Sequence, residues 1–257
     1  PVAADKFRLY RFKGKKRLSP EDYEVSHQGY YNKFVLEDPN RLVPLDAART
    51  AEADGRIGAL LEAFYSTAGV MQSVEKSREM GQGIACSLRH NGVDGVILTS
   101  TCGTSTRCGA YMACEIEIAG IPVVHVTNLT QISEGVGCSR ILKGSNISHV
   151  FGNPDIPPEQ EAEWRKRLFD RALALLEEVP ALSSIEERML KMESAAVNEK
   201  SLEAYRLTHI DGLDFIGNAE NAEQAGVAEM LKGLPEPFKE DYSAHILSEL
   251  AERNDFE

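Results

Sequence analysis

The chain has 257 residues, 42% of them hydrophobic, and a formal net charge of −12. An acidic chain without a basic stripe cannot neutralise phosphates, so we expect no nucleic acid partner. There is also no apolar run near the ~20 residues of a membrane helix and no secretory signal, so we expect no membrane association and a cytoplasmic location. The chain begins at Pro1, which fits removal of an initiator methionine, trimming or cleavage of a precursor.

The amino-terminal third combines a basic cluster with several predicted helices. Residues 6–17 form a basic cluster, which we expect to be a solvated segment, with a docking edge for an acidic partner subunit as the alternative. Ser19 followed by Pro20 and two acidic residues predicts a helix start. Helices are also predicted over residues 44–53 and 55–65.

The middle of the chain predicts a β-α-β unit. A helix over residues 73–89 leads to a short apolar strand at 96–98, which is rich in β-branched residues. Ser105 or Thr106 is expected to cap a helix that runs to about residue 119, and residues 121–126 form a second buried strand. This pattern places a cysteine just after a strand and just before a helix, where open α/β sheets bind ligands.

That cysteine, Cys102, is the candidate nucleophile. A free thiol titrates near ~8.5, and a helix N-terminus contributes roughly 0.3–1 kcal/mol, so the helix alone would not make a strong nucleophile. Arg107 and His125 are the candidate cations that would complete the activation. The alternative is that Cys102 is an inert small hydrophobic residue and His125 a satisfied buried histidine. Cys86, by contrast, is expected to belong to the core.

The remaining elements follow from the same patterns. Residues 129–140 are rich in glycine and hydroxyl groups and predict a loop with a short helix, whose backbone amides could stabilise an oxyanion. Arg140 would bind a substrate carboxylate or form an ordinary surface pair. A third strand is predicted over 147–151, and helices over 157–179 and 183–205.

These elements predict an α/β fold with an open, mostly parallel sheet. We expect a flavodoxin-like or racemase-like three-layer half with a helical carboxyl-terminal extension. The predicted domains are an α/β catalytic domain over 1–180 and a helical or irregular extension over 181–257 that packs on a partner subunit. Five cysteines, three of them in one motif, favour a reducing compartment over a disulfide framework. Their spacing suits no metal site.

Several stretches resemble the selenoprotein B component of the glycine, sarcosine and betaine reductases and the related D-proline reductase subunit. The resemblance covers about residues 10–153 and corresponds to the carboxyl half of the long family members. It is carried by LSPEDYEVSHQGYY, DPNRLVPLDAAR, DGRIGALLEAFYSTAG, TSTCGTSTRCGA, EIEIAGIPVVH and ISEGVGCSRI.

The resemblance implies a reaction and its site. In the family, a selenocysteine attacks the substrate carbon after a pyruvoyl group on another subunit has activated the amine. Here Cys102 stands at that position, and a cysteine six residues later is kept as Cys108, so both are expected to be catalytic. We expect no cofactor in this chain. The predicted substrate-binding residues are Thr101, Gly103, Thr104, Ser105, Arg107, His27, His125 and Arg140.

Two departures from the family keep three functions open. Cysteine replaces selenocysteine at position 102, and Ser105 replaces a further cysteine of the family. The first function is reductive cleavage of a C–N or C–S bond in a small carboxylate-bearing substrate, which needs a thiol reductant. The second is a thiol-dependent hydrolase or lyase, for example a desulfurising enzyme. The third is a non-catalytic subunit that completes a partner's site. All three fit a homo-oligomer or a hetero-oligomer with a second subunit.

Overall fold

The structure is a computed structural model, and the residues it describes are 6–25, 30–67, 72–178, 187 and 189–196. Its centre is a parallel sheet with the strand order β3-β4-β5. β3 (Val96–Thr99) pairs with β4 (Val123–Thr127), which in turn pairs with β5 (Ile141–Lys143). The predicted open parallel sheet and the predicted β-α-β unit are therefore confirmed.

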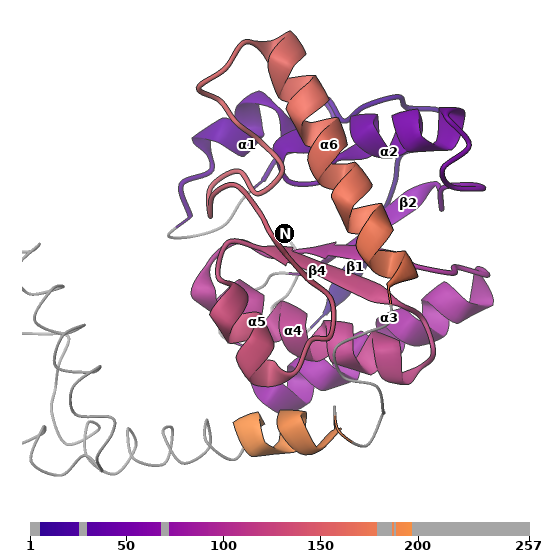
Figure 1. Ribbon diagram of the computed structural model, residues 1–257, viewed down its shortest axis with the longest axis vertical. Coiled ribbons are helices and arrows are strands. Elements are labelled where there is room, and N and C mark those ends of the chain that lie inside the picture. The colour runs from indigo at the N-terminus through magenta and orange to yellow at the C-terminus, as the bar shows by residue number, and fades with distance from the viewer. Residues whose placement is uncertain (1–5, 26–29, 68–71, 179–186, 188, 197–257) are drawn as a thin grey trace, which may run out of the picture. The chain divides into compact units, whose positions relative to one another are not determined.

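Helices cover both faces of this sheet (Figure 1). Alternate residues of β4 point to opposite sides, as strand geometry requires. Val123 belongs to a core with α3 (Val74–His90), α4 (Gly103–Ile118) and α5 (Thr130–Val136). Val124 and Val126 belong to a second core with α2 (Leu45–Ala53) and α6 (Pro158–Glu177). The result is the three-layer arrangement that the sequence predicts.

The amino-terminal segment differs from the prediction. Residues Phe7–Arg11 form β1, which pairs antiparallel with β2 (Ala63–Thr67), so the basic cluster is not simply a solvated segment. The helix predicted over 55–65 is wrong as well. Gly55, at a φ of +70°, follows the end of α2, and the aromatic residues of β2 stack across the sheet, with Phe64 and Tyr10 ring centroids 5.5 Å apart.

Two further predictions are corrected. Ser19 begins a turn and not a helix. Its carbonyl accepts from the amides of Asp22 and Tyr23, but helical hydrogen bonding does not continue along the residues that follow. The third strand lies at 141–143 and not at 147–151. The later stretch forms tight turns, such as the bond from the Gly152 amide to the His149 carbonyl at 2.9 Å, and Val150 and Phe151 are buried in the core that contains α6.

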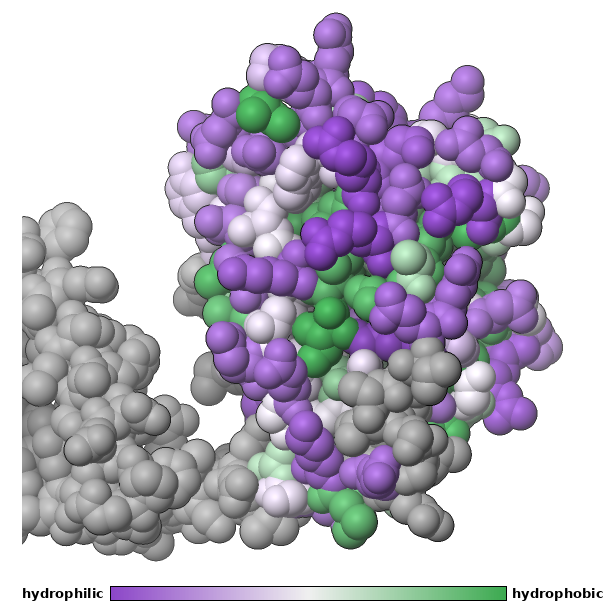
Figure 2. Space-filling model, in the orientation of Figure 1, coloured by the Kyte–Doolittle hydropathy of each residue, from purple (hydrophilic) through white to green (hydrophobic). Residues whose placement is uncertain are grey.

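The carboxyl-terminal predictions lie partly outside the described residues. Residues 187 and 189–196 are helical, and Met192 packs into the core with α3 and α4. The predicted domain boundary at 180/181 falls among residues 179–186, which are not described, so it stays a prediction. No helix among the described residues is long and apolar enough to cross a membrane. The face in Figure 2 is mostly hydrophilic, with hydrophobic residues gathered toward its middle.

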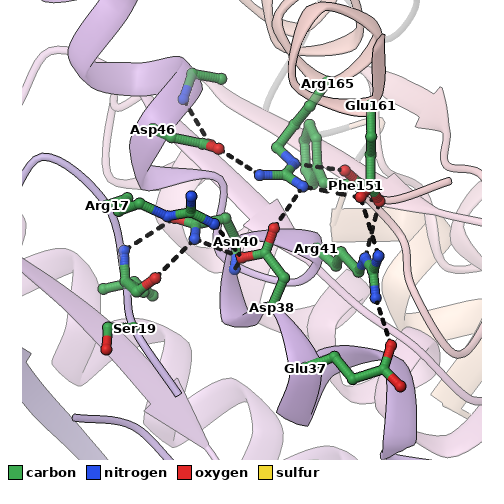
Figure 3. A network of polar contacts seen from close by, with 12 residues as sticks. Arg17, Ser19, Glu37, Asp38, Asn40, Arg41, Asp46, Phe151, Glu161 and Arg165 are labelled. Carbon is green, nitrogen blue, oxygen red and sulfur yellow. Dashed lines mark hydrogen bonds and ion pairs between the residues drawn. The ribbon is translucent and has the colours of Figure 1, made fainter. Parts of the chain in front are cut away.

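A network of charged side chains joins α6 to the amino-terminal segment (Figure 3). Arg165 of α6 is only 2% exposed; its guanidinium donates to the Phe151 carbonyl at 3.0 Å and pairs with Asp38 and Asp46. Glu161 of the same helix pairs with Arg41 at 2.8 Å. Arg41 lies in the 3-10 helix η1 (Pro39–Arg41), which follows α1 (Lys33–Glu37). A buried cation is tolerated only when it is paired in this way.

The ionisation of Asp38 depends on this network. Burial by itself raises the pKa of this carboxyl, but hydrogen bonds from Asn40 and the charge of Arg165 outweigh burial and lower the pKa below its ordinary value. Asp38 is therefore an anion where the Arg165 cation needs one.

Replacing Arg165 by methionine should destabilise the protein by about 3–5 kcal/mol, because Asp38 and Asp46 lose their buried cation. Urea unfolding followed by circular dichroism measures the change. The matched control is Arg167→Met on the same helix, whose side chain is 63% exposed and pairs with the 59% exposed Glu163 at 3.6 Å. It should change stability little, since exposed pairs contribute little. Equal effects of the two substitutions would contradict the assigned role of Arg165.

Candidate functional site

Cys102 lies at the carboxyl end of β3 and is the N-cap residue of α4, with its side chain half-buried. The helix begins at Gly103, earlier than the predicted caps Ser105 and Thr106. The Ser105 hydroxyl instead fixes the turn: it donates to the Cys102 carbonyl at 3.0 Å and accepts from the Thr101 amide at 2.9 Å. Ser105, where the resemblance predicted a further cysteine, therefore holds the backbone around the thiol.

The environment of Cys102 favours its thiolate form. Burial raises the pKa of the thiol, but hydrogen bonds from the hydroxyls and backbone amides of Thr104 and Ser105 outweigh burial and lower the pKa below its ordinary value. The Thr104 hydroxyl lies 3.4 Å from the Cys102 sulfur. The first amides of a helix have no partner within the helix, so they are available to a thiolate at the N-cap.

Arg107 and Cys108 lie next to each other on the side of α4 that meets the segment before α3. The Arg107 guanidinium donates to the Gln72 carbonyl and lies 4.0 Å from the Cys108 sulfur. Cys108 is fully buried, and its sulfur is 3.9 Å from the same carbonyl. The five largest influences on the pKa of Cys102 include neither residue. A resolving role for Cys108 and a charge role for Arg107 stay predictions.

His125 is fully buried on β4, on the side that faces α4. Its Nε2 lies 2.8 Å from the Ser100 hydroxyl and its Nδ1 2.6 Å from the Ser133 hydroxyl. It therefore joins the end of β3, two residues before Cys102, to α5. This geometry matches the predicted alternative of a satisfied buried histidine, and a direct substrate contact stays a prediction.

The structure adds a second buried thiol beside His125. The Cys138 sulfur is 3.7 Å from Nδ1 of His125 and 3.5 Å from the Ala110 carbonyl. A hydrogen bond with Cys114 is the largest influence on its pKa, and together with His125 it lowers the pKa despite burial. The spacing of the cysteines in the sequence did not indicate that Cys138 lies beside His125 and Cys114.

Arg140 lies at the opposite edge of the sheet from Cys102. It directly precedes β5 and pairs with Glu117 in the last turn of α4 at 2.6 Å, and its guanidinium also donates to the Glu178 carbonyl at 3.1 Å. Because α4 begins directly after Cys102 and ends beside Arg140, the helix separates the two residues. Its predicted carboxylate-binding role is untested. His27 lies outside the described residues.

Tyr30, which the sequence analysis did not select, contacts the loop after β5. Its hydroxyl donates to the Ser148 carbonyl at 2.9 Å. Burial, and then the negative charge of Cys102, raise the pKa of Tyr30 above its ordinary value. Ile132 of α5 lies close to Gly103, the residue after Cys102. A Cβ added to Gly103 would lie 3.7 Å from the Ile132 Cδ1 atom. The only sequence signal was the Gly-Tyr-Tyr run after His27.

No group of three or more His, Cys, Asp or Glu side chains among the described residues could hold a metal ion. A groove between α3 and α4 is lined by residues that include Gln82, Cys86 and Glu115, and none of the predicted site residues lines it. Cys86 is exposed there, which makes it a useful reference thiol. Fold and site together define an α/β protein with a half-buried cysteine at a helix N-terminus, whose surroundings lower the pKa of its thiol.

Comparison with known proteins identifies its family. The profile of the glycine/sarcosine/betaine reductase selenoprotein B family matches residues 2–101, ending one residue before Cys102. The D-proline reductase subunit gamma of Acetoanaerobium sticklandii is 32% identical over 173 residues, which are 65% of this chain and 68% of that protein. The chain therefore belongs to the glycine/sarcosine/betaine reductase selenoprotein B family, as the motifs predict.

Two component B subunits are more similar. The glycine reductase complex component B subunit gamma of Carboxydothermus hydrogenoformans is 45% identical over 174 residues, 68% of this chain and 40% of that protein. The sarcosine reductase complex component B subunit beta of Peptoclostridium acidaminophilum is 41% identical over 175 residues, with the same coverage, 68% and 40%. The chain thus spans about 40% of the length of these relatives. No solved structure matches it.

Replacing Thr104 by valine should raise the pKa of Cys102, because a hydrogen bond that favours the thiolate is lost. Less thiolate is then present at neutral pH, so alkylation of Cys102 by iodoacetamide should slow by about threefold to tenfold and its pH midpoint should rise. Peptide mass spectrometry measures the rate. The matched control is Thr50→Val on α2, where the hydroxyl donates to the Asp46 carbonyl at 2.9 Å. An unchanged midpoint in Thr104→Val would contradict this assignment.

Proposed function

We propose that this chain is the thiol-bearing part of a component B reductase that cleaves the C–N bond of a small carboxylate-bearing amino acid derivative. The observation that carries the proposal is the position of Cys102 as the half-buried N-cap residue of α4, with the Thr104 hydroxyl 3.4 Å from its sulfur. It is supported by the relatives, which are named as subunits of glycine, sarcosine and betaine reductase complexes. A hetero-oligomer with a further subunit is part of the proposal, since the chain spans about 40% of those relatives.

In the first step, the Cys102 thiolate attacks the substrate carbon that carries nitrogen. An S–C bond forms and the C–N bond breaks; the bonding pair leaves with nitrogen, which takes up a proton. The resemblance assigns activation of this poor leaving group to a pyruvoyl group on a partner subunit. What this chain supplies is the nucleophile, kept anionic by the hydroxyls and amides of the first turn of α4.

The second step needs two electrons, and a dithiol reductant supplies them. Cleavage of the S–C bond returns Cys102 as a thiol and gives the substrate carbon a hydrogen, while the dithiol loses two protons and two electrons and becomes a disulfide. Ser105 cannot serve as a resolving thiol, and Cys108 is fully buried. The reductant therefore comes from outside the first turn of α4.

Ser105 in place of a thiol and the full burial of Cys108 also favour one competing function. A non-redox hydrolase or lyase, including one that cleaves a C–S bond, needs no second thiol beside Cys102 and would also use this site. It would turn over without a reductant. A non-catalytic subunit is the remaining alternative, and in it Cys102 would show no unusual reactivity.

The decisive measurement is the rate of alkylation of Cys102 by iodoacetamide as a function of pH. Because its pKa is lowered, Cys102 should react at least about tenfold faster than exposed Cys86 in the same sample at pH 7. Glycine, sarcosine and betaine are then tested for protection of Cys102 and, together with the partner subunit that carries the pyruvoyl group, for turnover, each with and without dithiothreitol. Turnover that requires the dithiol supports the reductase, and turnover without it supports the hydrolase or lyase.

Equal reactivity of Cys102 and Cys86 across the pH range would overturn the proposal. The matched variants are Cys102→Ala and Cys86→Ala. Cys102→Ala should abolish turnover and protection, whereas Cys86→Ala should leave both unchanged, because Cys86 lies on α3 in a groove apart from the site.

A further inference from the structure

The backbone that carries Cys102 is held on one side by its own helix. The Thr101 amide donates to the Ser105 hydroxyl at 2.9 Å, and that hydroxyl donates to the Cys102 carbonyl at 3.0 Å. The Thr106 amide, one turn into α4, donates to the same carbonyl at 2.8 Å. These bonds tie the turn to α4, but they do not fix the turn relative to the sheet. The residue that joins the turn to the sheet is Ser100, which directly follows β3.

Ser100 is held by β4 through both its backbone and its side chain. Its amide donates to the Val126 carbonyl at 3.0 Å, which continues the pairing of β3 with β4 beyond Thr99. Its hydroxyl lies 2.8 Å from Nε2 of His125, the preceding residue of β4. Ser100 is only 4% exposed, and His125 is fully buried. The last residue before Thr101 therefore contacts one strand with its main chain and its side chain together.

The imidazole of His125 suits this position because it is flat and has a hydrogen-bond partner at each nitrogen. Its second nitrogen, Nδ1, lies 2.6 Å from the Ser133 hydroxyl of α5 and 3.7 Å from the Cys138 sulfur. Ser133 is fully buried as well. A buried network in which every member has a partner is rigid, so the ring holds the Ser100 hydroxyl in one place.

Gly109 shows how closely α4 lies on this pair. A Cβ added to Gly109, in the second turn of α4, would lie 2.2 Å from the Ser100 hydroxyl oxygen and 3.0 Å from His125 Nε2. The helix backbone therefore lies directly on the contact between the two side chains. Because Cys102 is the N-cap residue of the same helix, the pair of Ser100 and His125 sets where α4 starts relative to the end of β3.

We propose that His125 is a positioning residue for the nucleophile: through Ser100 it fixes the turn in which Cys102 meets the donors of α4. In this role His125 needs no contact with the substrate. It acts by keeping the Cys102 sulfur beside the Thr104 hydroxyl, which lies 3.4 Å away. The inference rests on the proposed function only in taking Cys102 as the attacking residue. Such positioning matters, because a misplacement of about 1 Å can cost about a hundredfold in rate.

Two substitutions of His125 separate the roles of its two nitrogens. Glutamine can place an amide near the position of Nε2 and keep the bond to Ser100, whereas asparagine reaches only the position of Nδ1. His125→Asn should raise the pH midpoint of Cys102 alkylation by iodoacetamide and slow the reaction at pH 7 by about threefold to tenfold, and His125→Gln should recover most of this loss. Peptide mass spectrometry measures the rates, with exposed Cys86 as the reference thiol in each sample.

Two further variants test whether the effect passes through Ser100. Ser100→Ala should slow Cys102 as much as His125→Asn does, and the double variant should be no slower than either single variant, because both remove the same contact. The matched control is Ser77→Ala on α3. It removes another buried hydroxyl, which donates to the Ser73 carbonyl at 2.9 Å, and should leave Cys102 unchanged.

A loosened fold would have the opposite effect, since Cys102 and buried Cys108 would then both be alkylated faster. If His125→Asn exposes Cys108 in this way, Ser100→Ala, which removes a single oxygen atom, decides the question. An unchanged midpoint in Ser100→Ala overturns the proposal, and so does an equal rise in His125→Gln or Ser77→Ala.

The wild-type protein separates this inference from the proposed function. A lowered midpoint for wild-type Cys102 that the variants leave unchanged overturns the positioning role alone. A wild-type midpoint no lower than that of Cys86 overturns the proposed function and the positioning role together, because no activated thiol is then present.

Discussion

The site depends on one constraint, the start of α4 directly after Cys102. A helix leaves its first amides without partners, and here the amides and hydroxyls of Thr104 and Ser105 lower the pKa of Cys102. These amides and two hydroxyls favour the thiolate more than burial disfavours it. The direction of specific donors matters more here than a cation or the helix dipole, which is worth less than one hydrogen bond to a charged group.

The surrounding structure keeps this turn in place with buried polar contacts. Ser105 holds the backbone on both sides of Cys102, and His125 links Ser100 to Ser133 behind it. Gly109 is needed for this arrangement, because a Cβ there would lie 2.2 Å from the Ser100 hydroxyl oxygen. Each group has a partner, which is the condition under which a buried polar network adds rigidity.

The amino-terminal segment reaches the site through packing on α6. Arg165 and Glu161 hold Asp38, Asp46 and Arg41, so the chain around α1 is fixed beside the loop after β5.

The sequence by itself determined the β-α-β unit, the position of Cys102 and the family, because hydrophobic periodicity, turn residues and a long motif are local. It could not place Arg140, Tyr30 or Cys138. Arg140 pairs with Glu117 at the far edge, and Tyr30 and Cys138 meet their partners only through tertiary packing. The same limit explains two of the three misassigned elements. Residues 63–67 became a strand by pairing with β1, and residues 147–151 a loop by packing on α6, both of which involve distant contacts.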